Sequence, residues 1–406
     1  MNRQFLKLRT IIIVILILLT ITGLFFANYF YAKNYPGGKN FQTQWIATRA
    51  TIFENESPYS DSVLYKIQLS AYGRPAMSGE FEFGFNYPFF ALAVFLPFGL
   101  IKSLAVARAA WMLVLEILVV LTYLLSINLG NWKPNLRTNV LLFSFFVTFY
   151  HTLRVVIDGN LIVLTTLLLI ASLICIRDRH DEAAGMLLLG LALEIQFTFV
   201  ILLIILCYAV INKRPKILNY FIGSLIILLG FSFLLRPDWS SGYFTQLSKS
   251  IFDFSYSSIG GTLKSILGAV GSRLAITISI MMVILLIIES YLAQKKSFRH
   301  FIWFIFLSLI IIQWAGLPSY PGNFFLLMPG LIFSMQVINE RWKLKGEMII
   351  FLISIILYIS IWVLFFVLGN GEPAYVESSL FFVIFPLVEI LLLYWAKWWI
   401  NKNPAI

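Results

Sequence analysis

The sequence predicts an all-α, polytopic integral membrane protein. Of its 406 residues, 60% are hydrophobic and only 12% are charged, whereas soluble domains typically carry about 25% charged residues. Apolar runs near or above the ~20 residues that an α-helix needs to cross a bilayer recur along the whole chain. We therefore expect a single membrane domain over residues 1–406, with about 12 transmembrane helices.

The first apolar segment, Ile11–Tyr31, is too long for the core of a signal peptide and lacks a small-residue cleavage pattern, so we interpret it as an anchor. Tyr87–Leu100 is short for a span and is bounded by prolines, so we expect it to re-enter or to lie in the membrane interface. If it crosses, the number of spans rises by one. The other predicted spans are Ala107–Ile127, Val140–Tyr150, Leu161–Ile176, Ala183–Glu194, Phe197–Ile211, Ile217–Leu235, Leu274–Ala293, Phe301–Trp314, Phe324–Ile338, Met348–Leu368 and Leu380–Trp398.

Basic residues predict the sidedness of these spans. The net charge is +11, and Lys and Arg concentrate in short connections, which favour the cytoplasmic side. These clusters are Asn2-Arg3 with Lys7 and Arg9, Lys133 with Arg137, Arg177–His180, Lys213–Lys216, Lys295-Lys296 with Arg299, and Arg341–Lys345. We therefore expect a multi-pass cell-membrane protein with both termini in the cytoplasm. The basic charge indicates contact with anionic membrane lipids and no nucleic-acid partner.

Two long polar segments then fall on the outer face, at residues 37–85 and 236–273. Within the first, Gln42–Glu54 has helical spacing of its apolar residues, and Ser60 or Asp61 can cap a second helix that runs to Tyr72. We expect both to be short amphipathic helices on the membrane surface. Long loops in compact proteins are usually functional. The remaining outer segments are expected at His151–Asn160, Glu194–Gln196, Gln313–Asn323 and Gly369–Ser378.

A series of short motifs follows the chain in a consistent order. They are Gly-x-x-Phe-x-x-x-Trp-x-x-x-Arg-Ala over residues 38–50, Ser57-Pro58-Tyr59, Tyr72–Pro75, Tyr87-Pro88, Ala107–Trp111, His151–Arg154, Asp158-Gly159-Asn160, Arg236–Trp239, Gln313-Trp314 and Pro321–Phe324. Together they resemble glycosyltransferase family 87. The resemblance implies a GT-C-like fold and transfer of a hexose, most commonly mannose, from a polyprenyl-phosphate sugar to a lipid or glycan acceptor at the outer face.

The sequence departs from this family at two positions. In such enzymes the residue just before the Phe-x-x-x-Trp run is an aspartate, and the resemblance implies that it is the general base. In this chain the same position is Asn40. A central lysine-proline pair is replaced by Gln196-Phe197. Because an amide cannot act as a general base near neutral pH, a catalytically silent relative that binds lipid-linked glycans is the alternative. A transporter or flippase is a third hypothesis, and the lack of internal repeats weighs against it.

Three residues are candidates for the catalytic position: Asn40, Asp158 and Glu194. Asn40 is either a substrate ligand or a turn residue after Gly37-Gly38. Glu194 lies in an apolar stretch, where it is either functional or a solvated tip between two spans. Arg154 is four residues before Asp158, so the two can form an ion pair on one helix face, or Arg154 can grip a lipid phosphate.

The remaining candidates are predicted to bind substrate. The backbone amides around Asn323, which follows Pro321-Gly322, suit an anionic group together with Lys264, although Asn323 can also be a helix cap. The complete set of predicted binding residues is Trp45, Arg49, Tyr59, Arg154, Asn160, Gln196, Lys264 and Asn323. The histidines, cysteines and carboxylates show no metal-ligand spacing, so we expect neither a metal site nor a cofactor.

Overall fold

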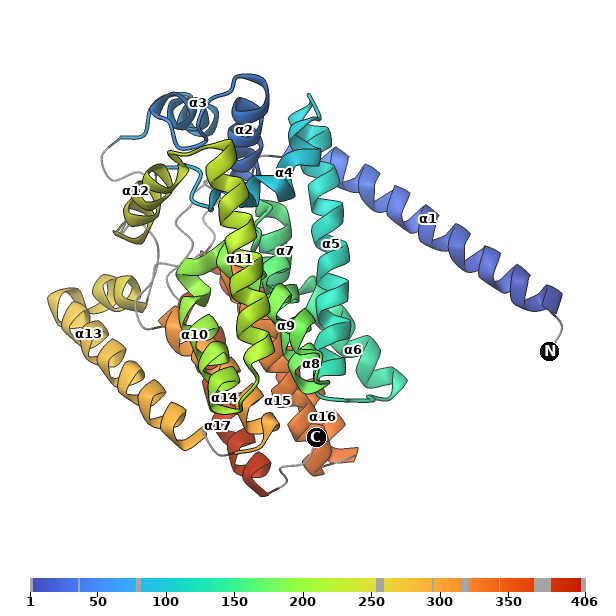
Figure 1. Cartoon of the computed structure of the whole chain (residues 1–406). Helices are drawn as coiled ribbons and strands as arrows, with labels where there is room; N and C mark the ends of the chain where they lie inside the picture. The colour runs from blue at the N-terminus through green and yellow to red at the C-terminus, as the bar shows by residue number, and fades with distance from the viewer. Residues whose placement is uncertain are drawn as a thin grey trace.

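The computed structural model describes residues 3–35, 37–77, 82–252, 259–293, 296–314, 321–342, 344–368 and 381–402, and every regular element within them is a helix (Figure 1). The predicted all-α class is therefore confirmed for these ranges. The expected outer segment Gly369–Ser378 lies outside the described residues.

Eight segments are long and apolar enough to cross a membrane, and a ninth results if the bent pair α6–α7 is one span. The polytopic character is confirmed, whereas the expected number of twelve is not. The eight comprise α1 (Arg3–Asn34), α5 (Leu104–Leu129), the segment Asp181–Ile211, α11 (Pro215–Leu235), α13 (Ile259–Ala293), η3 (Pro321–Leu327) with α15 (Met328–Trp342), α16 (Leu344–Leu368) and α17 (Phe381–Lys402). Shorter apolar helices cover Phe89–Gly99, α8 (Ile162–Arg177) and α14 (Phe298–Trp314).

The segment Asp181–Ile211 is a hairpin and not one straight helix. It consists of α9 (Asp181–Leu187), the 3-10 helix η2 (Leu188–Glu194) and α10 (Ile195–Ile211). Arg214 forms an ion pair with Asp181, and Lys216 Nζ lies 2.9 Å from Glu182 Oε1, so the two ends of the segment meet. A straight helix of this length would hold its ends about 45 Å apart. The turn that the sequence predicted near Glu194 is therefore present.

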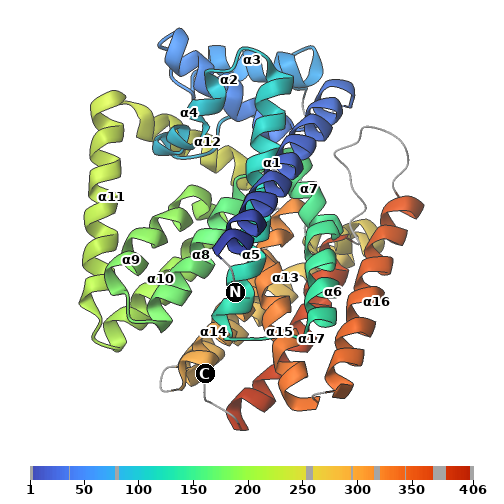
Figure 2. The same ribbon diagram turned by 90° about the vertical axis from the view of Figure 1, so that its right-hand side faces the viewer.

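The amphipathic helices predicted in the first outer segment form α2 (Lys39–Phe53) and α3 (Asp61–Tyr72). The Ser60 hydroxyl caps α3 by accepting a hydrogen bond from Val63 N at 3.4 Å, as expected. Residues 87–100 form the short helices η1 (Phe89–Ala91) and α4 (Leu92–Gly99), and the second outer segment contains α12 (Trp239–Phe252). Figures 1 and 2 show α2, α3, α4 and α12 gathered at one end of the bundle, opposite the C-terminus.

The helices differ strongly in how much of their surface is buried. In α14 every residue from Arg299 to Trp314 is buried, and α15 is buried from Met328 to Ile338. A helix that is apolar on all sides and buried belongs to the centre of a bundle. The apolar window of α1 has no buried residue, and the helix projects from the bundle in Figure 1. This exposure is typical of a helix that faces lipid.

The chain between α5 and α8 packs closely against α2 at Gly159. After α6 (Leu136–Thr148) the chain bends by 44° into α7 (Tyr150–Asp158), which Gly159 ends in the left-handed conformation, φ 73°. A Cβ on Gly159 would lie 2.5 Å from Phe41 Cβ and 3.1 Å from Trp111. Glycine is therefore required here both by backbone conformation and by the contact between α7 and α2.

We predict that Gly159→Ala destabilises the protein more than the same change at Gly73, which has a similar φ of 71° but no atom within 4 Å of its missing Cβ. The left-handed backbone costs a non-glycine residue about 1–2 kcal/mol, and overpacking at Gly159 adds about 1–3 kcal/mol. Gly223→Ala is the control, because Gly223 has open space and no left-handed backbone. Thermal unfolding in detergent measures all three; equal losses at Gly159 and Gly73 would show that Phe41 simply moves aside.

Candidate functional site

A buried carboxylate, that of Glu194, lies at the centre of the site. Glu194 is the last residue of η2, at the tip of the hairpin, and only 3% of it is exposed. The Tyr87 hydroxyl donates a hydrogen bond to this carboxylate, and Gln196 Nε2 donates to its Oε2 at 3.2 Å. The interpretation of Glu194 as a solvated tip is therefore wrong, because the outer helices cover it.

Tyr87 connects this carboxylate to the first outer segment. Its hydroxyl is also bonded to the side chain of Gln44 on α2 and to the backbone of Leu161, while its carbonyl accepts a hydrogen bond from the Tyr59 hydroxyl at 2.7 Å. Burial, followed by the Glu194 charge, raises the pKa of Tyr87 well above its ordinary value. The phenol therefore stays protonated and acts as a hydrogen-bond donor to Glu194.

Aromatic side chains from both outer segments cover the same position. The Tyr59 ring lies 5.6 Å from Phe85 and 6.3 Å from Tyr243 of α12. Burial raises the pKa of Tyr243, and the nearby Glu194 charge adds to this effect. Burial likewise raises the pKa of Tyr59. The site thus offers neutral hydroxyl groups around a single carboxylate.

Asn40 lies on the side of α2 that faces this cluster. It is four residues before Gln44, and residues at this spacing share one helix face. Because Gln44 is bonded to Tyr87, Asn40 is about one helical turn from the Tyr87–Glu194 pair. Asn40 is half-buried and belongs to the first turn of α2, so it is not a loop turn residue.

Cations gather around the start of α2. Arg108 is 4% exposed; its guanidinium donates to the carbonyls of Tyr35 at 3.2 Å and Ile157 at 3.3 Å, and its charge reaches Asp158. Arg154 Nε lies 3.1 Å from Asp158 Oδ2, so the ion pair that the sequence allowed is formed. We call Arg108, Arg154 and Asp158, together with Lys39 of α2, the cationic corner.

Lys39 has an unusual environment for a lysine. Its amine lies 5.0 Å from the Tyr72 ring centroid and 5.4 Å from that of Phe83. Burial lowers the pKa of Lys39. Since the N-terminus of a helix also carries partial positive charge, the start of α2 favours an anion.

Two asparagines join the α7–α8 junction to η3. Asn160 Nδ2 donates to Asn323 Oδ1 at 2.9 Å, and Asn160 Oδ1 accepts from Ile162 N at 2.9 Å. Gln313 Nε2 donates to the Asn323 carbonyl at 3.3 Å. Both predicted residues are buried, and Asn160 precedes Leu161, whose backbone is bonded to Tyr87.

Other predicted binding residues lie away from Glu194. Trp45 Nε1 donates to the Ile101 carbonyl at 3.2 Å, and Arg49 donates to that of Gly99 at 2.9 Å. These bonds fasten α2 to the end of α4. Lys264 is exposed on α13, and within the described ranges no hydrogen bond or ion pair joins it to the cluster.

Four residues that the structure brings to the site were not among the predicted site residues: Gln44, Tyr87, Arg108 and Tyr243. Tyr87 and Arg108 each occur in a motif of the family resemblance, and that was the available signal. Their partners, Glu194 and Asp158, are distant in sequence, so no local spacing indicates the pairing.

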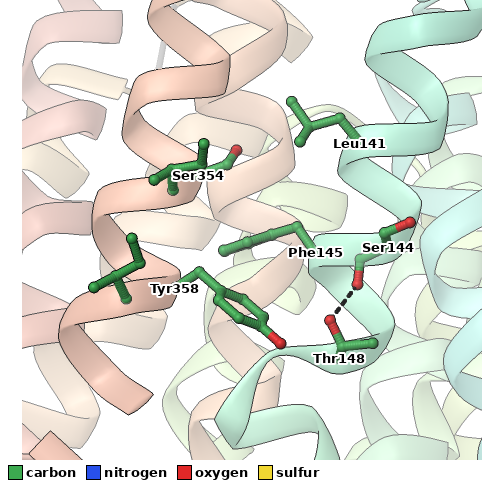
Figure 3. Close-up of a pocket in the computed structure, with 8 residues that line it drawn as sticks. Leu141, Ser144, Phe145, Thr148, Ser354 and Tyr358 are labelled. Atoms are coloured by element: carbon green, nitrogen blue, oxygen red, sulfur yellow. Dashed lines mark hydrogen bonds between the residues drawn. The ribbon is translucent and has the colours of Figure 1, made fainter. Parts of the chain in front are cut away.

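Away from Glu194, the described residues form a groove but no metal-binding group. In the part of the chain that the structure describes, no group of three His, Cys, Asp or Glu side chains could hold a metal. A groove of about 310 Å³ lies between α6 and α16 (Figure 3), and no charged side chain lines it. Its lining residues are Leu141, Ser144, Phe145, Thr148, Ser354, Ile355, Tyr358 and Ile359.

Part of the chain is similar to a known protein family. The model of a family described as Glycosyltransferase family 87 matches residues 85–312. This range includes Tyr87, Arg108, Asp158, Glu194 and Tyr243, but not Asn40. No curated protein and no solved structure matches the chain.

We predict measurable coupling between Arg154 and Asp158, because their side chains are only 29% and 19% exposed. A double-mutant cycle with Arg154→Gln and Asp158→Asn should give a coupling free energy of about 1 kcal/mol or more in unfolding experiments. The control cycle is Lys66→Gln with Glu54→Gln, a pair with side chains 39% and 48% exposed, for which little coupling is expected. Equal coupling free energies in the two cycles would show that burial does not strengthen the Arg154–Asp158 ion pair.

Proposed function

The chain belongs to glycosyltransferase family 87, and from this premise we propose that it transfers a hexose, with mannose as the first choice. The donor is a polyprenyl-phosphate sugar. The acceptor is a hydroxyl of a lipid or glycan at the outer membrane face. The observation that carries the proposal is the buried Glu194 carboxylate, held by Tyr87 beneath both outer segments. Buried ionisable groups inside a membrane protein are costly and usually functional.

Glu194 is the general base in this proposal. It takes the proton of the acceptor hydroxyl while the acceptor oxygen bonds to the anomeric carbon, and the bond from that carbon to the phosphate oxygen breaks. The polyprenyl phosphate leaves with the electron pair, and one direct displacement inverts the anomeric centre. Among the described residues the hydrogen-bond partners of the carboxylate are neutral, Tyr87 and Gln196, whereas Asp158 is already paired with Arg154.

The cationic corner is suited to the departing phosphate. Arg154 and Arg108 carry guanidinium groups, which bind phosphate oxygens well, and Lys39 adds a third cation at a helix N-terminus. Stabilising the charge that develops on the leaving group is a major source of catalysis. Asn40 and Gln196 then act as hydrogen-bonding ligands of the sugar, and Tyr59, Asn160 and Asn323 hold the surrounding elements in place.

The second candidate is a catalytically silent relative that binds lipid-linked glycans. Asn40 supports it, because this side chain occupies the presumed base position and cannot accept a proton near neutral pH. The two functions differ in whether a carboxylate elsewhere replaces the missing base.

We predict that Glu194→Gln lowers the transfer rate by about 10²–10⁴-fold, the usual contribution of a general base, while the protein still folds. Transfer of radiolabelled mannose from a synthetic polyprenyl-phosphate donor to membrane lipids measures the rate. Glu116→Gln, the same change on the half-buried face of α5, is the matched control and should retain activity.

Other outcomes of this assay separate the alternatives. Donor binding by the wild type without transfer, together with transfer by Asn40→Asp, would identify the silent relative. Undiminished transfer by Glu194→Gln would remove Glu194 from the base position and direct attention to Asp158. Tyr87→Phe should reduce transfer, whereas Tyr123→Phe, which loses a 2.6 Å bond to Asn139, should affect only stability.

We also predict that the site faces the outside of the cell. In a variant without Cys175 and Cys207, a cysteine at Tyr65, which is 51% exposed on α3, should react with a membrane-impermeant maleimide in intact cells. A cysteine at exposed Lys216 should react only after the membrane is opened. Labelling in the reverse order would invert the orientation and place the reaction on the cytoplasmic face.

A further inference from the structure

Tryptophans and cations gather near the C-terminal ends of α15 and α17. In Figures 1 and 2 this end of the bundle is opposite α2, α3 and α12. We call this group the Trp–Arg cluster. Its members are Arg341, Trp342, Trp395, Trp398, Trp399 and Lys402. The cluster is distant from the two outer segments and has no role in the proposed transfer reaction.

Aromatic rings hold the Arg341 guanidinium in one place. Its Cζ lies 4.4 Å from the centroid of Trp398, 4.9 Å from that of Trp399 and 5.2 Å from that of Trp342. Trp342 is itself stacked on Trp395, at 4.7 Å between centroids. Within the described residues Arg341 Nε is buried and has no hydrogen-bond partner, so the terminal N–H groups of the guanidinium are the ones that can bind an anion.

Lys402 places a second cation beside the same ring. Its Nζ lies 4.4 Å from the Trp398 centroid, so the Lys402 and Arg341 charges can be no farther apart than twice that distance. Two like charges within this limit repel each other, and an anion that contacts both relieves the repulsion. A tetrahedral oxyanion has the size and the acceptor atoms to bridge them.

Three described acids, one each on α13, α15 and α16, lie at this end, and each has another partner. Glu340 forms an ion pair with Arg299, and Glu289 lies 2.6 Å from Lys397. Glu347 accepts a hydrogen bond from Asn135 at 2.5 Å. Among the described residues, neither Arg341 nor Lys402 takes part in an ion pair. The structure therefore leaves two cations whose counter-charge comes from outside these helices.

The surface next to these cations is apolar and continues along α17. Leu387, Leu391, Trp398 and Lys402 are separated by four, seven and four residues, which places them on one helix face. Leu387 is 42% exposed, Leu391 63% and Trp398 44%. A ligand that binds between the cations thus meets a hydrocarbon-like stripe on one side.

We propose that the Trp–Arg cluster binds an anionic glycerophospholipid. Its phosphodiester lies between Arg341 and Lys402, and an acyl chain follows Leu391 and Leu387 along α17. Tryptophans and basic residues at the end of membrane helices are typical of the headgroup level of a bilayer. A free phosphate would use only the two cations, whereas a lipid uses the cations and the stripe together.

Thermal unfolding of the full-length protein in mixed micelles tests this site. Phosphatidylglycerol should raise the melting temperature more than phosphatidylcholine with the same acyl chains, because only the first carries a net negative charge. Lys402→Gln should lower the apparent affinity for phosphatidylglycerol by about ten-fold, as expected for the loss of one charge-assisted hydrogen bond. Lys345→Gln is the matched control, since Lys345 is exposed on neighbouring α16 but contacts none of the rings.

Native mass spectrometry gives a second readout that does not depend on the melting temperature of a variant. The wild type should retain one more phosphatidylglycerol molecule than Lys402→Gln, and Leu391→Asn should also lose it. An equal response to the two lipids, or the same loss in Lys345→Gln, would overturn the proposal. Stabilisation by inorganic phosphate equal to that by phosphatidylglycerol would also overturn it, because a soluble anion would then suffice.

Discussion

The burial of the Glu194 carboxylate is the constraint on which the arrangement of the outer half depends. A charged or polar group away from water is costly unless hydrogen bonds compensate it, and here Tyr87 and Gln196 provide them. Because Tyr87 is in turn held by Gln44 and the backbone of Leu161, the hairpin tip, α2 and the α7–α8 junction must meet at one point. The close contact of Gly159 with Phe41 follows from the same meeting.

The site has two electrostatically distinct parts. Glu194 lies among neutral phenol and amide groups, while Arg108, Arg154 and Lys39 lie near the start of α2. A transfer reaction needs a proton acceptor near one reactant and positive charge near the leaving group, and a single carboxylate beside a cation would serve neither purpose well. Asn40, a neutral side chain, lies in the first turn of α2, the helix that carries both Lys39 and Gln44.

The two ends of the bundle offer different chemistry to different ligands. The end formed by α2, α3 and α12 covers a carboxylate, whereas the opposite end of α15 and α17 presents cations among tryptophans (Figure 2). The largely buried α14 and α15 connect the two ends, since Gln313 contacts Asn323 near the site and Glu340 pairs with Arg299 at the far end. α1 projects from the bundle in Figure 1 and reaches the cationic corner through Tyr31, whose ring centroid lies 5.5 Å from Arg108 Cζ.

The sequence by itself determined the features that depend on local patterns. Hydropathy predicts the membrane class, helical spacing predicts α2 and α3, and the polar residues near Glu194 predict the turn between α9 and α10. Tertiary structure decided the rest. Tyr87, which donates to Glu194, and Tyr243, which lies near its charge, are more than 45 residues away in either direction, and no periodicity encodes such contacts. Arg154 and Asp158 share a helix face in the sequence, but only the fold shows them paired to each other. Trp45 and Arg49 are residue types that often bind substrates, but their polar groups are bonded to the end of α4. The sequence gives the chemistry of a side chain, whereas tertiary packing determines which group it contacts.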